Sequence, residues 1–277
     1  MNGATFKISI LTLFLFINFF SKGYSIGEIN QVGARDVALG NATVALISSF
    51  SVFNNQATLA FHKEVTLALD YRQPYLIDRF AIKSLAITIP TPLSIFAFSV
   101  QQKGIVGYNE SRFGFAMAKK LGKNFSGGLQ FNYFLVDFPE QGSNLGTLLI
   151  EFGVLFQTKN NLAIGFHFFN PSGAAIESLN FRSKMPVITT IGISLKPSPD
   201  LLIVSSIAYD NDKPFNIRMG IEYQFAERFF VRGGISGKPI RHSAGIGYKC
   251  RNFATDVAFV HHESLGYTPS ISLILNF

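Results

Sequence analysis

The sequence predicts an antiparallel transmembrane β-barrel of about fourteen strands, with a short N-terminal segment that contains a helix and fills the barrel. Three observations lead to this fold class. Hydrophobic residues make up 48% of the chain, yet they form no long apolar run beyond the N-terminus. Most of the chain alternates between apolar and polar residues, and very short connections alternate with longer ones.

Apolar content without a membrane-spanning helix is the first observation. The uncharged stretch 37–61 contains several Asn and Ser residues, and the stretch 84–102 is interrupted by Pro90 and Pro92, so neither predicts a transmembrane helix. A soluble β-sandwich would also alternate, but with a polar outer face and more charge. Charged residues make up only 15% of this chain, and Phe alone occurs 30 times. The composition therefore favours a barrel whose apolar face meets lipid.

Alternation with a period of two identifies the strands. In the segment Phe215–Phe225, every second residue is Phe, Ile, Met or Tyr, and the residues between are Asn, Arg, Gly, Glu and Gln. A helix would show a period of 3.6 instead. Most segments of this kind have about ten residues, which suits a tilted membrane-spanning strand. They lie near 64–71, 80–90, 93–102, 108–121, 124–136, 146–157, 161–170, 185–196, 200–210, 214–225, 228–237, 240–249, 252–261 and 268–277.

The connections between these segments give a separate argument. Every second connection is very short: Thr91-Pro92, Gly122-Lys123, Lys159-Asn160, Pro197–Pro199, Ala226-Glu227 and Cys250-Arg251. Short periplasmic turns that alternate with longer outer loops are typical of outer-membrane barrels. We expect the longest outer loop at Pro171–Lys184, with fourteen residues, and the others to have four to nine residues.

Residues 1–25 predict a cleaved secretory signal. Lys7 precedes an uncharged run at 8–20, and Gly23 and Ser25 offer small residues for cleavage; an N-terminal anchor is the alternative. Together with the barrel, this segment predicts the outer membrane of a Gram-negative bacterium. The basic residues are scattered and form no run, which excludes a nucleic-acid footprint and is compatible with contact to outer-membrane lipids.

Residues 26–63 differ from the rest, because they lack the strand pattern. A short helix is expected within 33–46. A fourteen-strand barrel is wide enough that its lumen must be filled if it is not to leak. We therefore divide the chain into a signal peptide (1–25), a hatch or plug segment (26–63) and the barrel (64–277). A flexible periplasmic leader is the alternative for 26–63.

The hatch segment resembles a known family. It contains Gly33-Ala34-Arg35, then Leu39-Gly40-Asn41-Ala42, then Asn55-Gln56-Ala57-Thr58-Leu59. This pattern is similar to the opening of outer-membrane proteins of the FadL type and of their PorV and PorQ relatives from Bacteroidota. Gln56 and Thr58 replace the Pro and Gly of the family pattern, and Ser48-Ser49 replaces an acidic pair. The resemblance implies a hatch inside a fourteen-strand barrel.

Charged residues at alternate strand positions should line the lumen opposite the apolar face. We expect such residues to pair with each other and with the hatch, or to mark a ligand pathway. Arg218 and Glu222 lie four apart on one strand, so each should find a cross-strand partner. The candidate lumen residues are Asp70, Arg112, Glu151, Arg218, Glu222, Arg232 and Asp256.

Two functions follow from the resemblance, and neither is enzymatic. No catalytic, metal-binding or phosphate-binding signature occurs in the sequence, so we predict no enzyme, no cofactor and no metal site. A PorV- or PorQ-like role implies an accessory or shuttle barrel that binds secreted proteins or components of type IX-like secretion, and the short outer loops favour it. A FadL-like role implies hatch-gated transport of small hydrophobic compounds. An apolar pocket between the hatch and the outer loops would distinguish the second role.

Overall fold

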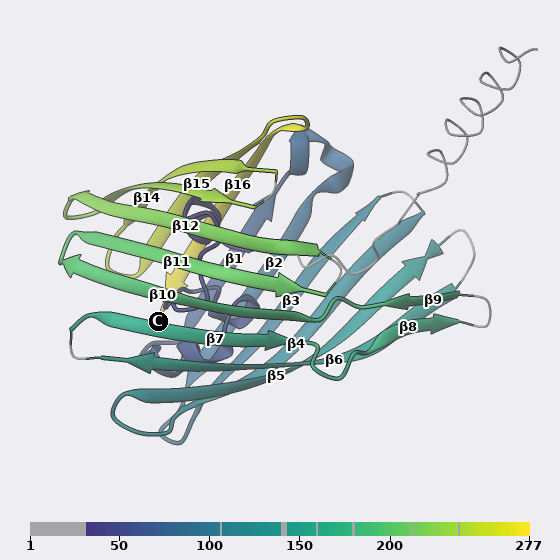
Figure 1. Cartoon of the computed structure of the whole chain (residues 1–277), viewed down its shortest axis with the longest axis horizontal. Coiled ribbons are helices and arrows are strands. Elements are labelled where there is room, and N and C mark those ends of the chain that lie inside the picture. The colour runs from purple at the N-terminus through teal and green to yellow at the C-terminus, as the bar shows by residue number, and fades with distance from the viewer. Residues whose placement is uncertain are drawn as a thin grey trace, which may run out of the picture.

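A closed antiparallel barrel accounts for most of the chain (Figure 1). The computed structural model describes residues 32–105, 107–139, 143–158, 160–178, 181–211, 213–237 and 239–277. Within these ranges fourteen strands form the barrel, each next to its neighbour in the chain, and the first barrel strand closes it against the last. The predicted fold class is confirmed. The predicted signal peptide lies outside the described residues.

The barrel strands coincide with the alternating segments of the sequence, and each begins and ends within a few residues of its prediction. They are β1 (Thr66–Arg72), β2 (Ile82–Pro90), β3 (Ile95–Ile105), β4 (Tyr108–Lys120), β5 (Phe125–Phe138), β6 (Ser143–Gln157), β7 (Leu162–Phe169), β10 (Ile188–Ser198), β11 (Leu201–Asp210), β12 (Lys213–Ala226), β13 (Phe229–Ser236), β14 (Arg241–Lys249), β15 (Phe253–His262) and β16 (Gly266–Asn276).

The loops add two features to what the sequence predicts. The longest connection, Pro171–Lys184, contains a separate hairpin of β8 (Ala175–Ser178) and β9 (Phe181–Lys184). Each of its strands has only four residues, too few for a periodic signal. The connection between β3 and β4 is shorter than expected, since β3 extends to Ile105 and β4 begins at Tyr108. We call the end of the barrel with β8 and β9 the hairpin end and the opposite end the short-turn end.

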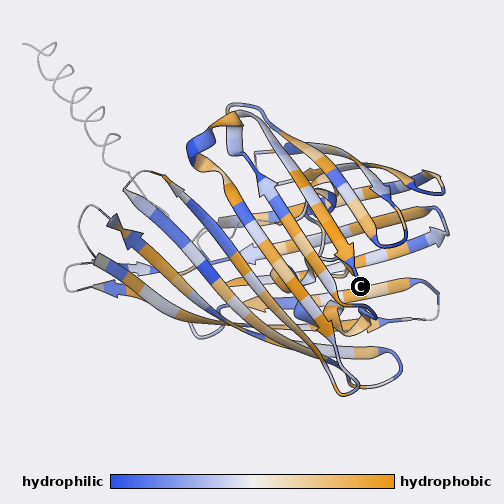
Figure 2. Ribbon diagram, turned by 180° about the vertical axis from the view of Figure 1, so that it is seen from behind, coloured by the Kyte–Doolittle hydropathy of each residue, from blue (hydrophilic) through white to orange (hydrophobic). Residues whose placement is uncertain are grey.

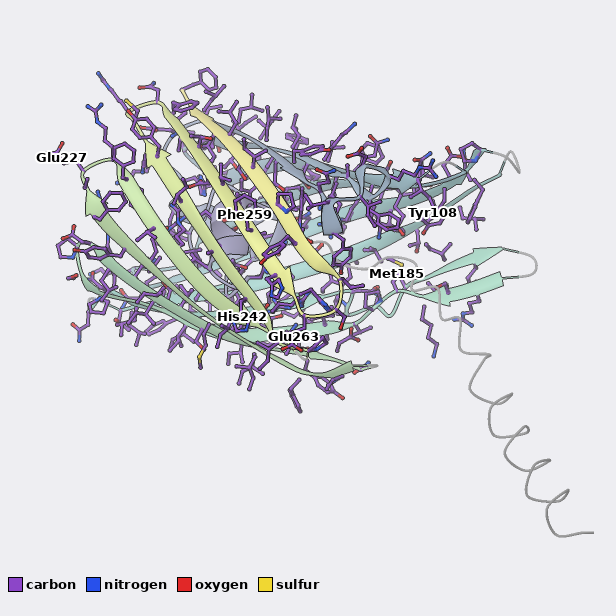
Figure 3. All side chains as sticks on the ribbon, turned by 90° about the horizontal axis from the view of Figure 1, so that it is seen from above. Tyr108, Met185, Glu227, His242, Phe259 and Glu263 are labelled. Carbon is purple, nitrogen blue, oxygen red and sulfur yellow. The ribbon has the colours of Figure 1, made fainter. Side chains whose placement is uncertain are left out.

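The connection between β1 and β2 adds two single-turn 3₁₀ helices at the hairpin end, η3 (Pro74–Leu76) and η4 (Asp78–Phe80). Figure 3 shows the two ends of the barrel: Tyr108 and Met185 lie toward the hairpin, and Glu227 lies at the short-turn end.

The outer surface of the barrel is apolar. On β12, Ile217, Met219 and Ile221 are about half exposed, whereas Gly220 and Glu222, which point to the other face, are buried. Figure 2 shows hydrophobic bands along the strands that alternate with polar ones. Such an inside-out distribution suits a wall that faces lipid on one side and a polar lumen on the other. None of the helices in the described residues is long and apolar enough to span a membrane.

Residues 32–63 lie inside the barrel as a compact segment (Figure 1). The expected helix is much shorter than 33–46: α2 covers only Ala34–Ala38. It ends there because Gly40 and Asn41 adopt positive φ angles of 64° and 61°, which turn the chain away from the helix axis. Two 3₁₀ helices follow, η1 (Ser51–Phe53) and η2 (Gln56–Phe61).

Candidate functional site

A chain of charged side chains joins the hatch to the wall at β12, β13 and β15. Arg35 binds Glu222 through two bonds of 2.7 Å, from Nε to Oε2 and from Nη2 to Oε1. Arg232 then donates to Glu222 at 2.5 Å and to Asp256 at 2.6 Å. Glu222 and Arg232 are direct cross-strand neighbours. Three of the predicted lumen residues are therefore brought together, and the hatch supplies the fourth member.

A second polar cluster lies on the opposite wall, around Glu151. Its carboxylate accepts hydrogen bonds from Gln56 of the hatch at 3.0 Å, from Asn132 at 2.7 Å, and lies 3.0 Å from His167 Nε2. Arg112 Nη1 is 3.9 Å from the same carboxylate. Glu151 is only 1% exposed, so this buried charge is held by polar contacts from both the hatch and three strands.

Gln56 was not among the predicted site residues. It occupies the position where the family pattern has Pro, and its side chain reaches Gln130 and Glu151. The departure from the family pattern was the signal that could have pointed to it, because an amide at this position can bond to the wall and Pro cannot.

The two other predicted lumen residues take no part in these clusters. Asp70 accepts hydrogen bonds from Ser270 at 3.2 Å and from Ser272 at 2.6 Å, which belong to the neighbouring strand β16. Arg218 donates to the carbonyl of Asn41 in the hatch at 3.3 Å. Glu222 therefore has the expected cross-strand partner, which is Arg232. Arg218 instead binds the backbone of the hatch.

The family-like residues of the hatch fix its backbone. Gly33, at a φ of 97°, starts α2, and the N–H of Ala34 donates to Ser272 at 2.7 Å. Asn55 starts η2: its side chain accepts from the N–H of Ala57 and donates to the carbonyl of Val44. The remaining pattern residues are buried against the wall: Leu39, Gly40, Ala42 and Leu59.

Glycines of the wall allow the hatch to approach seven strands closely. At Gly220 and Gly234 an added Cβ would come closer than 3 Å to backbone atoms of Leu39 and Gly40. Because any side chain there would collide with the hatch backbone, only glycine fits. We call this set the glycine belt: Gly128, Gly153, Gly165, Gly192, Gly220, Gly234 and Gly245, on β5, β6, β7, β10, β12, β13 and β14.

A cavity of about 590 Å³ lies on the hairpin side of the hatch. Its floor is formed by hatch residues, among them Val44, Phe53 and Asn54. One part of its wall is apolar and includes Phe80, Ile82, Phe169, Pro186, Ile188 and Ala208. Another part carries the charged residues Arg72, Lys103, Asp210, Arg218 and Arg241. The volume lies in the range typical of sites for small ligands.

An apolar cluster inside the barrel adjoins this cavity, and sequence reasoning missed it. Phe134, Leu149, Phe169 and Ile176 are each at most 5% exposed and pack together. The lumen was expected to be small and polar throughout. Ile176 belongs to the β8–β9 hairpin, which therefore packs on the inner face of β5 and β6 and makes this part of the lumen apolar.

Burial also perturbs two ionisable groups of the hatch. Desolvation raises the pKa of Asp36 to about 7, although Arg35 and the Ser48 hydroxyl act against it. The Asp36 carboxylate accepts from Ser48 and Asn54, both at 2.8 Å. Desolvation lowers the pKa of His62, whose Nε2 lies 3.1 Å from the carbonyl of Ser48.

Comparison with solved structures identifies the architecture. The chain is similar to a FadL homologue of Pseudomonas aeruginosa, with a TM-score of 0.63, 12% identity and coverage of 91% of this chain and 100% of that one. It is also similar to the toluene transporter TodX of Pseudomonas putida, with a TM-score of 0.68, 10% identity and coverage of 91% and 98%. The fold is that of the FadL-type outer-membrane barrels.

In sequence, no family model and no curated protein matches the chain. The FadL-type fold and the apolar exterior agree with the predicted location in the outer membrane of a Gram-negative bacterium. The finer resemblance to PorV and PorQ is not confirmed and stays a prediction.

Proposed function

We propose that this FadL-type barrel is a transport channel that takes up small hydrophobic compounds through the cavity above its hatch. The observation that carries the proposal is the cavity of about 590 Å³, one part of whose wall is apolar and whose floor is formed by the hatch. This is the feature that distinguishes transport from an accessory role. The likeness to a toluene transporter supports the same class of compound.

Binding can be measured with a tryptophan reporter, because the chain contains no Trp. Phe80 lines the cavity, so Phe80→Trp places a unique fluorophore in it. Phe259→Trp is the matched control, since Phe259 is 51% exposed on the outside of the barrel (Figure 3). The probe is bromobenzene, a small apolar compound that quenches tryptophan.

We expect saturable quenching in Phe80→Trp and only gradual, partition-driven quenching in Phe259→Trp. Adding Ala208→Phe to the Phe80→Trp protein should fill part of the cavity and abolish saturation, because Ala208 lines it. Quenching that fails to saturate in every variant would refute the proposal.

An accessory role in protein secretion, as in PorV and PorQ, is the second candidate. The short connections at the hairpin end favour it: β3 and β4, and likewise β11 and β12, are each joined by two residues. Such tight turns leave little chain for a ligand-capture site outside the barrel. Co-purification of this protein in a fixed ratio with components of a secretion machine, together with no saturable bromobenzene binding, would favour this candidate.

A further inference from the structure

The hatch contacts the barrel in two different ways. Toward β5–β7, β12 and β13 it lies against the glycine belt with backbone atoms of the hatch directly on the wall, and at Gly192 and Gly245 the side chains of Val44 and Ala38 make the contact. Toward β2–β4 the contact is made by side chains. There, Phe50, Val52, Phe53 and Leu59 of the hatch pack on alanines of the wall: Ala86, Ala97, Ala116 and Ala118.

The glycine on the inner face of β4 confirms this difference. The three atoms nearest to a Cβ at Gly114 would be side-chain atoms of the wall itself, those of Ser99, Gln130 and Asn132. Passage on the glycine-belt side therefore requires movement of the hatch backbone. Passage along β2–β4 requires only that side chains change rotamer, which is a smaller and faster rearrangement.

In the described part of the chain, buried polar atoms without a partner occur on this side of the hatch, as they also do at Ser206 of β11 and at Asn216 and Arg218 of β12. Thr88 Oγ1 on β2, Ser99 Oγ on β3, and Nε and Nη2 of Arg112 on β4 are buried and have no hydrogen-bond partner among the described residues. The three residues are at most 5% exposed. Burying such a group without a hydrogen-bond partner is unfavourable. These atoms are satisfied if water or a passing solute enters between the hatch and β2–β4.

Phe53 separates this region from the cavity. It lines the floor of the cavity and is itself 6% exposed. Its ring lies 5.5 Å from the guanidinium carbon of Arg112, and Arg112 lies 3.9 Å from Glu151, another residue of the cavity wall. A cation–π contact with Arg112 thus holds the Phe53 ring. Nε and Nη2 of the same arginine are the atoms that lack hydrogen-bond partners within the described ranges.

We propose that the route between the cavity and the short-turn end runs between the hatch and the inner faces of β2–β4, and that the side chain of Phe53 is its gate. The inference rests on the proposed transport function, because it supplies the path by which a compound leaves the cavity. The hatch stays seated in the glycine belt while the Phe53 ring swings out of the way.

Single-channel conductance in a planar bilayer tests the route. We expect steady conductance from Phe53→Ala and none from the wild-type protein. Leu39→Ala is the matched control: Leu39 is a fully buried hatch residue that packs over Gly220 of the belt, and it too loses a large side chain. It should stay closed, because the hatch backbone still seals that side. Equal conductance in both variants, or conductance only in Leu39→Ala, would overturn the proposal.

Cysteine labelling tests the same route in a protein with a milder change. In a Cys250→Ser background, Ser99→Cys reports on the β2–β4 side and Ser126→Cys on the side of the belt, where Ser126 is fully buried and donates to Ala57. With Phe53→Leu added, a small charged thiol reagent should label Ser99→Cys and leave Ser126→Cys unlabelled. Labelling of neither, or of Ser126→Cys alone, contradicts the route even if Phe53→Ala does not fold.

The conductance and labelling experiments can give a negative result while bromobenzene binding is positive, and the reverse also holds. Saturable bromobenzene binding without conductance or labelling would retain the cavity as a ligand site and reject Phe53 as the gate. Conductance through Phe53→Ala without bromobenzene binding would retain the route and reject small hydrophobic compounds as ligands.

Discussion

Arg35 of the hatch and Glu222 of β12 form a two-point ion pair with both N–O distances at 2.7 Å. The planar guanidinium matches the carboxylate in this geometry, and the two partners are 187 positions apart in the chain. Glu222 also accepts from Arg232, so one carboxylate serves two guanidinium groups, one from the hatch and one from the wall.

Glu222→Gln should therefore destabilise the protein more than Arg35→Gln. The first change leaves Arg35 without a carboxylate and Arg232 with Asp256 alone, at a cost of roughly 3–5 kcal/mol. The second leaves Glu222 still bound by Arg232 and removes a partly exposed side chain, which should cost roughly 1–3 kcal/mol. Urea unfolding of the refolded protein in lipid gives both free energies. A larger loss for Arg35→Gln would show that Glu222 is not the common partner.

Two adjacent glycines of β13 provide a matched test of the glycine belt. Gly234→Ala should reduce the free energy of unfolding or loosen the hatch, because the new Cβ would collide with the backbone of Leu39 and Gly40. Gly233→Ala should change little, because a Cβ at Gly233 meets nothing within 4 Å. Hydrogen exchange of residues 32–63 measures hatch seating directly, and similar exchange in the two variants would argue against the belt.

Gln56→Pro restores the residue of the family pattern and tests what the glutamine contributes. Gln56 is the first residue of η2, where Pro is tolerated, so the variant should fold. It should lose about 1–3 kcal/mol, because Glu151 and Gln130 lose a donor in a buried site. Thr58→Gly, the other reversion, is the control for restoring the pattern without touching Glu151. An unfolding free energy for Gln56→Pro equal to the wild type would assign Gln56 no role at the wall.

The raised pKa of Asp36 predicts a pH dependence of hatch stability. Folding holds a proton on Asp36 up to a pH of about 7, whereas the unfolded chain releases it near the ordinary value of 3.8. The unfolded state thus binds fewer protons between these values, so stability falls as the pH rises from about 4 to 7, by up to about 1.4 kcal/mol per pH unit. Asp36→Asn should remove this slope, as measured by unfolding at a series of pH values, and an unchanged slope would assign it to other groups.

The wall of the barrel could be read from the sequence, because each strand carries its own signal. Period-two alternation shows which residues share a face, so the inward positions of Glu222, Arg232 and Asp256 follow from their strands alone. Which of them touch depends on register between strands, and that is set by the lengths of turns and by bulges. The pairing of Glu222 with Arg232 therefore had to come from the structure.

The hatch could be predicted less well, since its conformation is imposed by its surroundings. Residues 33–46 have a helical pattern, but Gly40 and Asn41 turn the chain so that it follows the wall. The contact of Gln56 with Glu151 likewise joins residues 95 positions apart. The cavity floor, including Phe53, depends on this folded path and so could not be placed from sequence.

The glycine belt also constrains the order in which the protein assembles. The hatch precedes every strand in the chain, yet it contacts β13–β16, and the barrel closes only when β16 pairs with β1. A chain threaded through a closed ring would have to pass the glycines one after another. Closure around a hatch that is already docked avoids this passage. Substitutions in the hatch should therefore slow membrane insertion even where they leave the folded protein unchanged. The reason is that β16 can pair with β1 only after the hatch has docked.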